Sequence, residues 1–237
     1  TTNFPIPKDE AVENYFLEQN DKVHKMTLSL AQLQPDIIVY PEDTRYLVYL
    51  PSEEREALST TFPTTLIIDG ITTRIDNKSA NASFLYSTQR KKATQWGKSL
   101  LLPFNEYIPY VFRYAFSFFV PEENLGTYIQ NHTYTPVYSQ KTTIFNGLRV
   151  GTLICSEILS YKTIQNLKKE GPSLVFFQSH LNVFHDNPLF RIHLYSFTKV
   201  AAAQLRRPLI SSTNGAPSLL VSAHGKIILA IPTGFSV

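Results

Sequence analysis

Residues 148–157 read Leu-Arg-Val-Gly-Thr-Leu-Ile-Cys-Ser-Glu, an apolar run that ends at the single cysteine of a 237-residue chain. The run follows Asn146-Gly147, and a second β-type segment, 141–145, precedes that dipeptide. Because Asn-Gly readily adopts the positive φ angles of a two-residue turn, the two segments are predicted to pair as an antiparallel hairpin. The hairpin would place Cys155 at the end of its second strand.

Outward from this hairpin, strands and helices are expected to alternate along the chain. Asp69-Gly70 is expected to close a strand, and 78–81 to form a polar turn before the next one. Helices are predicted from Asp9 to Leu33, from a Ser160 cap to Lys169, and from Pro188 to Arg206; strands are predicted at 36–40, 66–68, 82–87, 174–177, 209–212, 218–222 and 226–231. The alternation indicates an α/β fold, and the hairpins require mixed sheets.

Composition narrows the class of protein. Hydrophobic residues make up 43% of the chain, enough for the core of one large domain. Charged residues are 17% and the net charge is +3, which argues against a nucleic-acid partner. No apolar run approaches the roughly 20 residues of a membrane span, so the chain is expected to be soluble or peripheral.

Three residues with reactive side chains come just after predicted strands: Glu42, Lys98 and Cys155. Loops at strand ends commonly carry catalytic groups in α/β folds. Taken singly, each has an ordinary explanation, as a solvated loop carboxylate, a surface lysine and a small core residue. The residues around them change that interpretation.

The segments that flank the three residues resemble the nitrilase superfamily, in the form characteristic of apolipoprotein N-acyltransferases. Residues 35–42 (PDIIVYPE) resemble the strand and catalytic glutamate, 98–109 (KSLLLPFNEYIP) the lysine segment, and 151–157 (GTLICSE) the nucleophile turn. Residues 207–215 and 224–227 resemble the closing strand, turn and hairpin. The resemblance covers nearly the whole chain in one order and implies a nitrilase-like α-β-β-α sandwich.

The resemblance implies a Glu-Lys-Cys triad, and the chemistry of that triad follows from the residue types. Cysteine attacks carbonyl carbon as the thiolate, so Glu42 is expected to accept the proton of Cys155. Lys98 is expected to favour the thiolate by Coulomb attraction and to face the oxyanion of the tetrahedral intermediate. The resemblance adds Glu106 as a second essential carboxylate that holds the lysine or steers the acceptor amine.

The same resemblance implies a reaction and a location. Cys155 would take an acyl chain from a phospholipid as a thioester and pass it to the amine of a diacylglyceryl-cysteine lipoprotein, without metal or organic cofactor. Expected substrate contacts are Glu157, His180, Asn182, Phe184, Tyr107 and Asn214. Residues 1–237 would be a single domain, trimmed at both ends, from a protein of the bacterial inner membrane, facing the periplasm or the cell exterior.

Two departures from the family pattern leave alternatives open. Ser156 stands where a large residue such as Tyr is usual, and 179–184 (SHLNVF) differs from the expected pocket segment. The aromatic segment 107–120 suits either a bilayer interface or a core helix. The alternatives are a soluble carbon-nitrogen hydrolase with the same triad, or a catalytically silent domain that binds lipoproteins.

Overall fold

The N-terminal half of the chain forms a sheet with helices on one side. The structure, a computed structural model, describes residues 12–75, 78–116, 118–119, 134–181 and 187–232. The elements of this half are α1 (Val12–Ser29), the 3-10 helix η1 (Leu30–Leu33), β1 (Ile37–Val39), α2 (Tyr46–Tyr49), α3 (Ser52–Thr61), β2 (Leu66–Ile75), β3 (Lys78–Ser87) and β4 (Lys92–Gly97). The sheet order is β1-β2-β3-β4, with β1 parallel to β2 and the other pairs antiparallel.

The C-terminal half forms a six-stranded sheet. Its elements are α4 (Tyr110–Phe116), β5 (Thr142–Phe145), β6 (Leu148–Ile154), the 3-10 helix η2 (Cys155–Leu159), α6 (Tyr161–Glu170), β7 (Leu174–His180), α7 (Pro188–Leu205), β8 (Leu209–Asn214), β9 (Ser218–Val221) and β10 (Ile227–Ile231). The order is β10-β9-β8-β7-β6-β5, parallel at β6-β7-β8 and antiparallel outside them.

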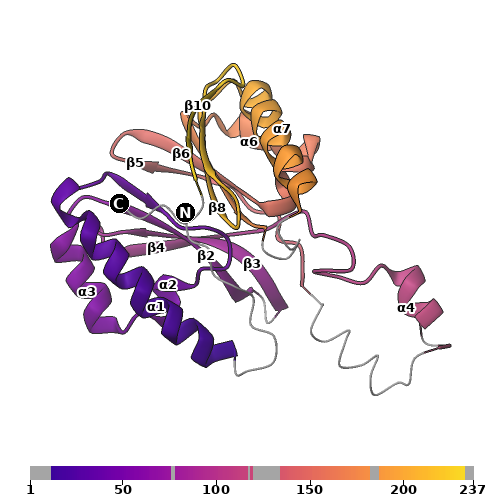
Figure 1. Ribbon diagram of the computed structural model, residues 1–237, viewed down its shortest axis with the longest axis horizontal. Helices are drawn as coiled ribbons and strands as arrows, with labels where there is room; N and C mark the ends of the chain where they lie inside the picture. The colour runs from indigo at the N-terminus through magenta and orange to yellow at the C-terminus, as the bar shows by residue number, and fades with distance from the viewer. Residues whose placement is uncertain (1–11, 76–77, 117, 120–133, 182–186, 233–237) are drawn as a thin grey trace.

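The two sheets pack face to face, and each carries helices on its outer side (Figure 1). One buried cluster, with Ile68, Trp96 and Phe176, joins the sheets. A second lies under α1–α3, and a third lies under α6 and α7. Burial of apolar area in these three layers is the main favourable contribution to folding. The expected α-β-β-α sandwich with mixed sheets is confirmed.

Turn and cap residues place several elements where the sequence predicted them. Asn146 and Gly147 have φ angles of 47° and 79°, which closes the β5-β6 hairpin. The Ser160 side chain accepts a hydrogen bond from the Thr163 amide at 3.1 Å and begins α6. Pro188 is the first residue of α7. The expected cap at Asp9 lies outside the described residues.

Two predicted turns are wrong. Asp69-Gly70 does not close a strand, because β2 continues through it to Ile75, and 78–81 belong to β3. Gly70 has another reason to be glycine: a Cβ there would lie 2.5 Å from the Pro41 carbonyl oxygen and 2.6 Å from the Glu42 Cα. The glycine therefore lets the chain after β1 cross directly over β2.

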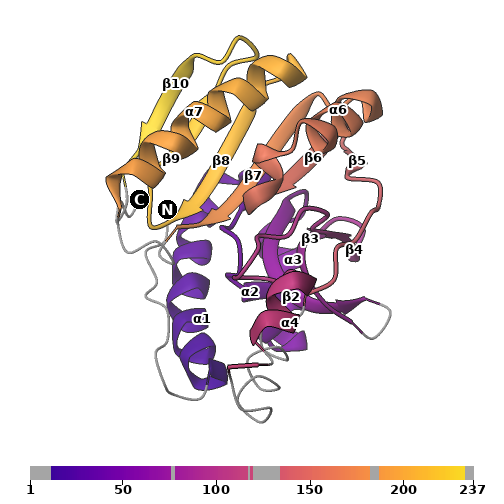
Figure 2. The same cartoon turned by 90° about the vertical axis from the view of Figure 1, so that its right-hand side faces the viewer.

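The aromatic segment does not form a core helix. Figures 1 and 2 show α4 at the side of the molecule, away from the helices that cover the sheets. Tyr110 is 81% exposed, Tyr114 64% and Phe119 85%. The rings of Phe104 and Phe112 pack against each other at 4.8 Å. The core-helix interpretation is therefore wrong for this segment, which leaves Tyr110, Phe112, Tyr114, Phe118 and Phe119 exposed.

Candidate active site

Glu42 lies three residues beyond β1, in a turn that rests on β2. The turn is strained, with φ angles of 61° at Asp43 and 56° at Arg45. Asp69 of β2 supports it, because the buried carboxyl group accepts a hydrogen bond from the Leu47 amide at 2.7 Å. Burial raises the pKa of Asp69 to about 8. The turn leaves Glu42 only 8% exposed.

Lys98 follows β4 and is enclosed between two carboxylates. Its Nζ lies 3.3 Å from Glu42 Oε1 and donates a hydrogen bond of 2.8 Å to Glu106 Oε1. Glu106 is itself fixed, because it accepts from Asn81 Nδ2 at 2.6 Å and from the Leu102 amide at 2.7 Å. Glu106 therefore holds the lysine, one of the two roles expected for it.

Cys155 begins η2 directly after β6, with a φ of 48°. This left-handed conformation is unfavourable for a residue with a side chain and turns the thiol away from the line of the strand. The thiol is partly exposed and hydrogen-bonds to the Glu42 carboxylate. The structure thus brings Glu42, Lys98, Glu106 and Cys155 together from three segments: the turn after β1, the loop between β4 and α4 that carries both Lys98 and Glu106, and the start of η2.

Burial and charge set the protonation of these groups. Burial raises the pKa of the Cys155 thiol, the negative charge of Glu42 adds to the increase, and Lys98 only partly opposes it. Burial also raises the pKa of Glu42. Burial disfavours the Lys98 ammonium, but the charges of Cys155, Glu42 and Glu106 outweigh it and raise its pKa. Lys98 was expected to favour the thiolate, and it acts in that direction, but burial outweighs it. The resting group is therefore a thiol beside a carboxylate whose pKa is raised.

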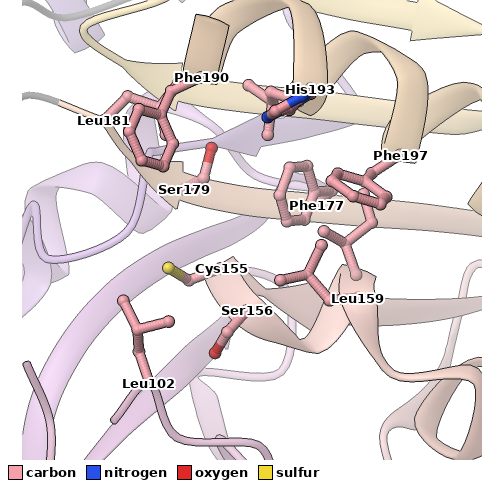
Figure 3. Close-up of a pocket in the computed structure, with 12 residues that line it drawn as sticks. Leu102, Cys155, Ser156, Leu159, Phe177, Ser179, Leu181, Phe190, His193 and Phe197 are labelled. Atoms are coloured by element: carbon pink, nitrogen blue, oxygen red, sulfur yellow. The ribbon is translucent and has the colours of Figure 1, made fainter. Parts of the chain in front are cut away.

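The other side of Cys155 is an apolar pocket of about 270 Å³ under α7 (Figure 3). Its walls come from the loop between β4 and α4, from η2, from the end of β7 and from α7: Leu102, Cys155, Ser156, Ile158, Leu159, Phe177, Ser179, Leu181, Phe190, His193, Leu194 and Phe197. The two serine hydroxyls are used within the protein, because Ser156 Oγ donates to the Leu100 carbonyl at 2.6 Å and Ser179 Oγ to Thr213 Oγ1 at 3.1 Å. The pocket suits a hydrocarbon occupant.

The expected substrate contacts lie in different places. His180 and Asn214 are paired at the ends of β7 and β8, with His180 Nε2 and Asn214 Nδ2 3.3 Å apart. Burial lowers the pKa of His180, which favours the neutral ring. Tyr107 is half-buried, and its carbonyl accepts from the Phe104 amide. Asn182 and Phe184 lie outside the described residues.

Glu157 does not have the place expected of a substrate contact. Its side chain is fully buried, and its carboxylate accepts from Ser99 N, Ser99 Oγ and Ile154 N and pairs with Lys141. A carboxylate enclosed in this way is held by the protein, so we correct its expected role from substrate contact to support of the surrounding loops.

Some residues of the site were missed from the sequence. Lys141 was treated only as the start of a strand, and Asn81 as part of a turn. The wall of α7 carried a signal that was not used, because Phe190, Leu194 and Phe197 recur at helical spacing and all line the pocket. Figure 3 shows Phe190 and Phe197 on this wall. Asn81 and Lys141 had no such signal, since both act through contacts distant in sequence.

The fold and the site together define a class. The structure is similar to that of a Nesterenkonia amidase from the nitrilase superfamily, with a TM-score of 0.66 and 10% identity over 98% of this chain and 84% of the amidase. The Saccharomyces cerevisiae member of branch 10 of that superfamily also gives a TM-score of 0.66, at 14% identity over 97% of this chain and 83% of its own. The chain therefore has the nitrilase-superfamily fold.

A particular enzyme is similar in sequence. The chain is 24% identical over 232 residues to the apolipoprotein N-acyltransferase of Aquifex aeolicus, which covers 97% of this chain and 50% of the relative. The chain thus spans about half the length of that enzyme. No protein-family model matches the chain. Within the described ranges, no helix combines the length and hydropathy of a membrane span.

Proposed function

We propose that this domain is an N-acyltransferase that moves a fatty acyl chain from a phospholipid, through a Cys155 thioester, to the terminal amine of a diacylglyceryl-cysteine lipoprotein. One observation carries the proposal: the cysteine stands between a buried Glu-Lys-Glu cluster and an apolar pocket. The first side supplies acyl chemistry, and the second accommodates a hydrocarbon chain. The similarity to the Aquifex enzyme supports the same assignment.

In the first step, Glu42 takes the thiol proton as Cys155 sulfur attacks the ester carbonyl carbon of the phospholipid. The negative charge that develops on the carbonyl oxygen is stabilised by the Lys98 ammonium, an interaction typically worth about 3 to 4 kcal/mol for one donor. The intermediate collapses, the C–O bond breaks, and Glu42 returns the proton to the departing lysophospholipid oxygen. The product is an acyl thioester on Cys155.

In the second step, the lipoprotein amine attacks the thioester carbonyl carbon. Glu42 accepts a proton from the attacking nitrogen, the C–S bond breaks, and the proton passes to the departing sulfur. We propose that Tyr107, His180 and Asn214 contact the acceptor, with Asn182 and Phe184 in the same role. The His180 ring, whose Nε2 accepts from Asn214 Nδ2, would be neutral and would therefore not repel a cationic amine.

The apolar pocket favours acyl transfer over hydrolysis of a small amide. A polar amide in this pocket would find few donors, because both serine hydroxyls of the wall already donate to protein oxygens and, apart from His193, the other side chains of the wall lack a strong hydrogen-bonding group. An alkyl chain would gain about 0.8 kcal/mol for each buried CH₂ group. A chain that fills the pocket would also keep water from the thioester until the amine arrives.

We further propose that the domain works at a membrane surface. The exposed aromatic residues on and beside α4 would lie in the interfacial region of a bilayer, where Tyr and Phe are favourable. By analogy with the Aquifex relative, which is about twice as long, residues 1–237 would be the catalytic domain of an inner-membrane protein that faces the periplasm or the cell exterior.

Intact-mass measurement tests the proposal. Incubation with phosphatidylethanolamine vesicles should add one acyl mass to the protein, hydroxylamine should remove it, and Cys155→Ala should prevent it. Addition of a diacylglyceryl-cysteine peptide should then discharge the acyl group to the peptide amine. Turnover of small amides without a lipid adduct would favour the hydrolase, and absence of both reactions would favour the silent binding domain.

A further inference from the structure

A second buried ion pair lies behind the catalytic residues. Lys141 is 4% exposed and Glu157 fully buried, and the Lys141 Nζ lies 2.7 Å from a Glu157 carboxylate oxygen. The same Nζ donates to the Gly97 carbonyl at 2.9 Å. Gly97 precedes Lys98 in the chain, and Glu157 is two residues after Cys155. One ammonium group therefore contacts the flanks of both catalytic residues.

Glu157 connects the same two loops through its carboxylate. It accepts from Ser99 N and Ser99 Oγ, each at 2.6 Å, and from Ile154 N at 3.0 Å. Ser99 follows Lys98, and Ile154 precedes Cys155. Each loop is thus held by Glu157 on one side of its catalytic residue, and Lys141 fixes the orientation of the carboxylate that holds them.

The backbone around Lys98 is closely packed and hydrogen-bonded, so it has little freedom to compensate for loss of the Lys141–Glu157 ion pair. Lys98 N donates to the Asn81 carbonyl at 2.7 Å, and Val137 N donates to the Lys98 carbonyl at 2.8 Å. Gly97 is tightly packed, since a Cβ there would lie 2.3 Å from Val137 Cβ. On the other loop, Cys155 keeps its left-handed φ only while its neighbours are held.

We infer that Lys141, through its ion pair with Glu157, is a positioning residue that sets the Lys98 ammonium relative to the Cys155 thiol. It does not contact the reacting atoms. It pairs with a buried carboxylate that accepts three hydrogen bonds, and it anchors that carboxylate to the end of β4. The role concerns any acyl donor at Cys155 and is independent of whether phospholipid is the natural one.

The test is the pre-steady-state reaction with p-nitrophenyl acetate, which reports on Cys155 without requiring a lipid. The burst amplitude counts folded, competent sites, and the burst rate constant reports on their geometry. For Lys141→Met, we expect the rate constant at saturating ester to fall about 10- to 100-fold while the half-saturating concentration changes less than threefold. Lys162→Met, an exposed lysine on α6, is the matched control and should keep the original rate constant.

The comparison of the burst rate constant with the half-saturating concentration is a readout that a purely structural role would not change. Loss of folded protein lowers only the burst amplitude, whereas misplacement of Lys98 lowers the rate constant at saturating ester. Adding Glu157→Gln to Lys141→Met removes the buried carboxylate that Lys141 neutralises.

The double variant also keeps the test valid if Lys141→Met fails to fold, because it leaves no unpaired buried charge. We expect it to fold and to react slowly, since a glutamine has one oxygen to accept from Ser99 and Ile154. A normal burst rate constant with only a reduced amplitude, in either variant, would overturn the positioning role. A complete lack of reaction in the unsubstituted protein would instead overturn the proposed enzyme itself.

Discussion

The two sides of Cys155 are built differently. On the side of Glu42, Lys98 and Glu106, buried charges are paired at 2.8 to 3.3 Å and fixed by further hydrogen bonds. On the side of α7, the walls are apolar and their hydroxyls are directed to protein oxygens. The charged side can act on the carbonyl of any acyl donor. The apolar side can distinguish donors only by the chain attached to that carbonyl.

The largest effect is expected on the charged side. Glu42→Gln keeps the size of the side chain but removes the base, so acylation of Cys155 should slow by about 10²- to 10⁴-fold. The loss should be equal for acetyl and decanoyl p-nitrophenyl esters, measured by stopped-flow absorbance. Glu56→Gln, at an exposed carboxylate, is the control. A loss that depends on chain length would contradict the division between the two sides.

The charged side was the part of the site that the sequence could predict. Its residues lie in short sequence motifs that come after predicted strands. Residues close together in the sequence therefore indicated both where the chain turns and which side chain it presents there. The apolar side is assembled from four elements far apart in the chain, so only the helical spacing of Phe190, Leu194 and Phe197 indicated it. Gly70 was misread as a turn because its packing against Glu42 is a tertiary contact.

The raised pKa of Cys155 also could not be deduced from the sequence. Residue types indicated that Lys98 would favour a thiolate, and the lysine does act in that direction. Burial outweighs it, because desolvation of a thiolate in this site costs more than one ammonium restores. An alkylating reagent is therefore not expected to react with Cys155 faster than with a free cysteine. Acylation of Cys155 is the suitable test of this site.

Asp69, which supports the turn that carries Glu42, should affect how the free energy of unfolding depends on pH. The pKa of Asp69 is about 8 in the folded protein, against an ordinary value of 3.8. Because the pKa of Asp69 is raised in the folded protein, its contribution to the free energy of unfolding is complete below about pH 4. That contribution is lost as pH rises from there through 8, by about 1.4 kcal/mol per pH unit. Asp69→Asn cannot ionise and should flatten this slope.

Urea denaturation of both proteins at pH 5, 6, 7 and 8 measures the difference. The free energy of unfolding of the original protein should fall relative to the variant as pH rises. Asp36→Asn, at an exposed carboxylate, should reproduce the original slope. Parallel curves for Asp69→Asn and the original protein would mean that Asp69 is ionised when buried and that the turn carrying Glu42 is held by a charge.

A smaller effect is expected on the apolar side. Leu194→Trp should fill part of the pocket under α7, so esters with long chains lose burial of their methylene groups. Each excluded CH₂ costs about 0.8 kcal/mol, so exclusion of two should slow decanoyl transfer roughly tenfold. Acetyl transfer should stay within about twofold. Ile192→Trp, on the exposed face of the same helix, is the control.

Equal slowing of acetyl and decanoyl transfer by Leu194→Trp would mean that the substitution disturbs η2 rather than the pocket. In that case, the two sides of Cys155 would not be separable. A change only in decanoyl transfer would assign chain selection to α7 and leave the chemistry to the charged cluster.

The smallest effect is expected for the exposed aromatic residues on and beside α4, which belong neither to the charged cluster nor to the apolar pocket. Phe119 is 85% exposed, so Phe119→Ser should leave the free energy of unfolding nearly unchanged. If the segment rests on a bilayer, the variant should lose part of one buried ring, roughly 1 kcal/mol or about fivefold in vesicle affinity. Cosedimentation with phosphatidylethanolamine vesicles measures this loss.

Tyr138→Ser is a matched control, because Tyr138 is 82% exposed but precedes β5 instead of adjoining α4. It should bind vesicles as the original protein does. Acylation by a water-soluble ester should be unaffected by either substitution, since neither residue contacts Cys155 or its pocket. Equal vesicle binding by Phe119→Ser and the original protein would remove the membrane from the role of this segment and leave the acyl chemistry of Cys155 intact.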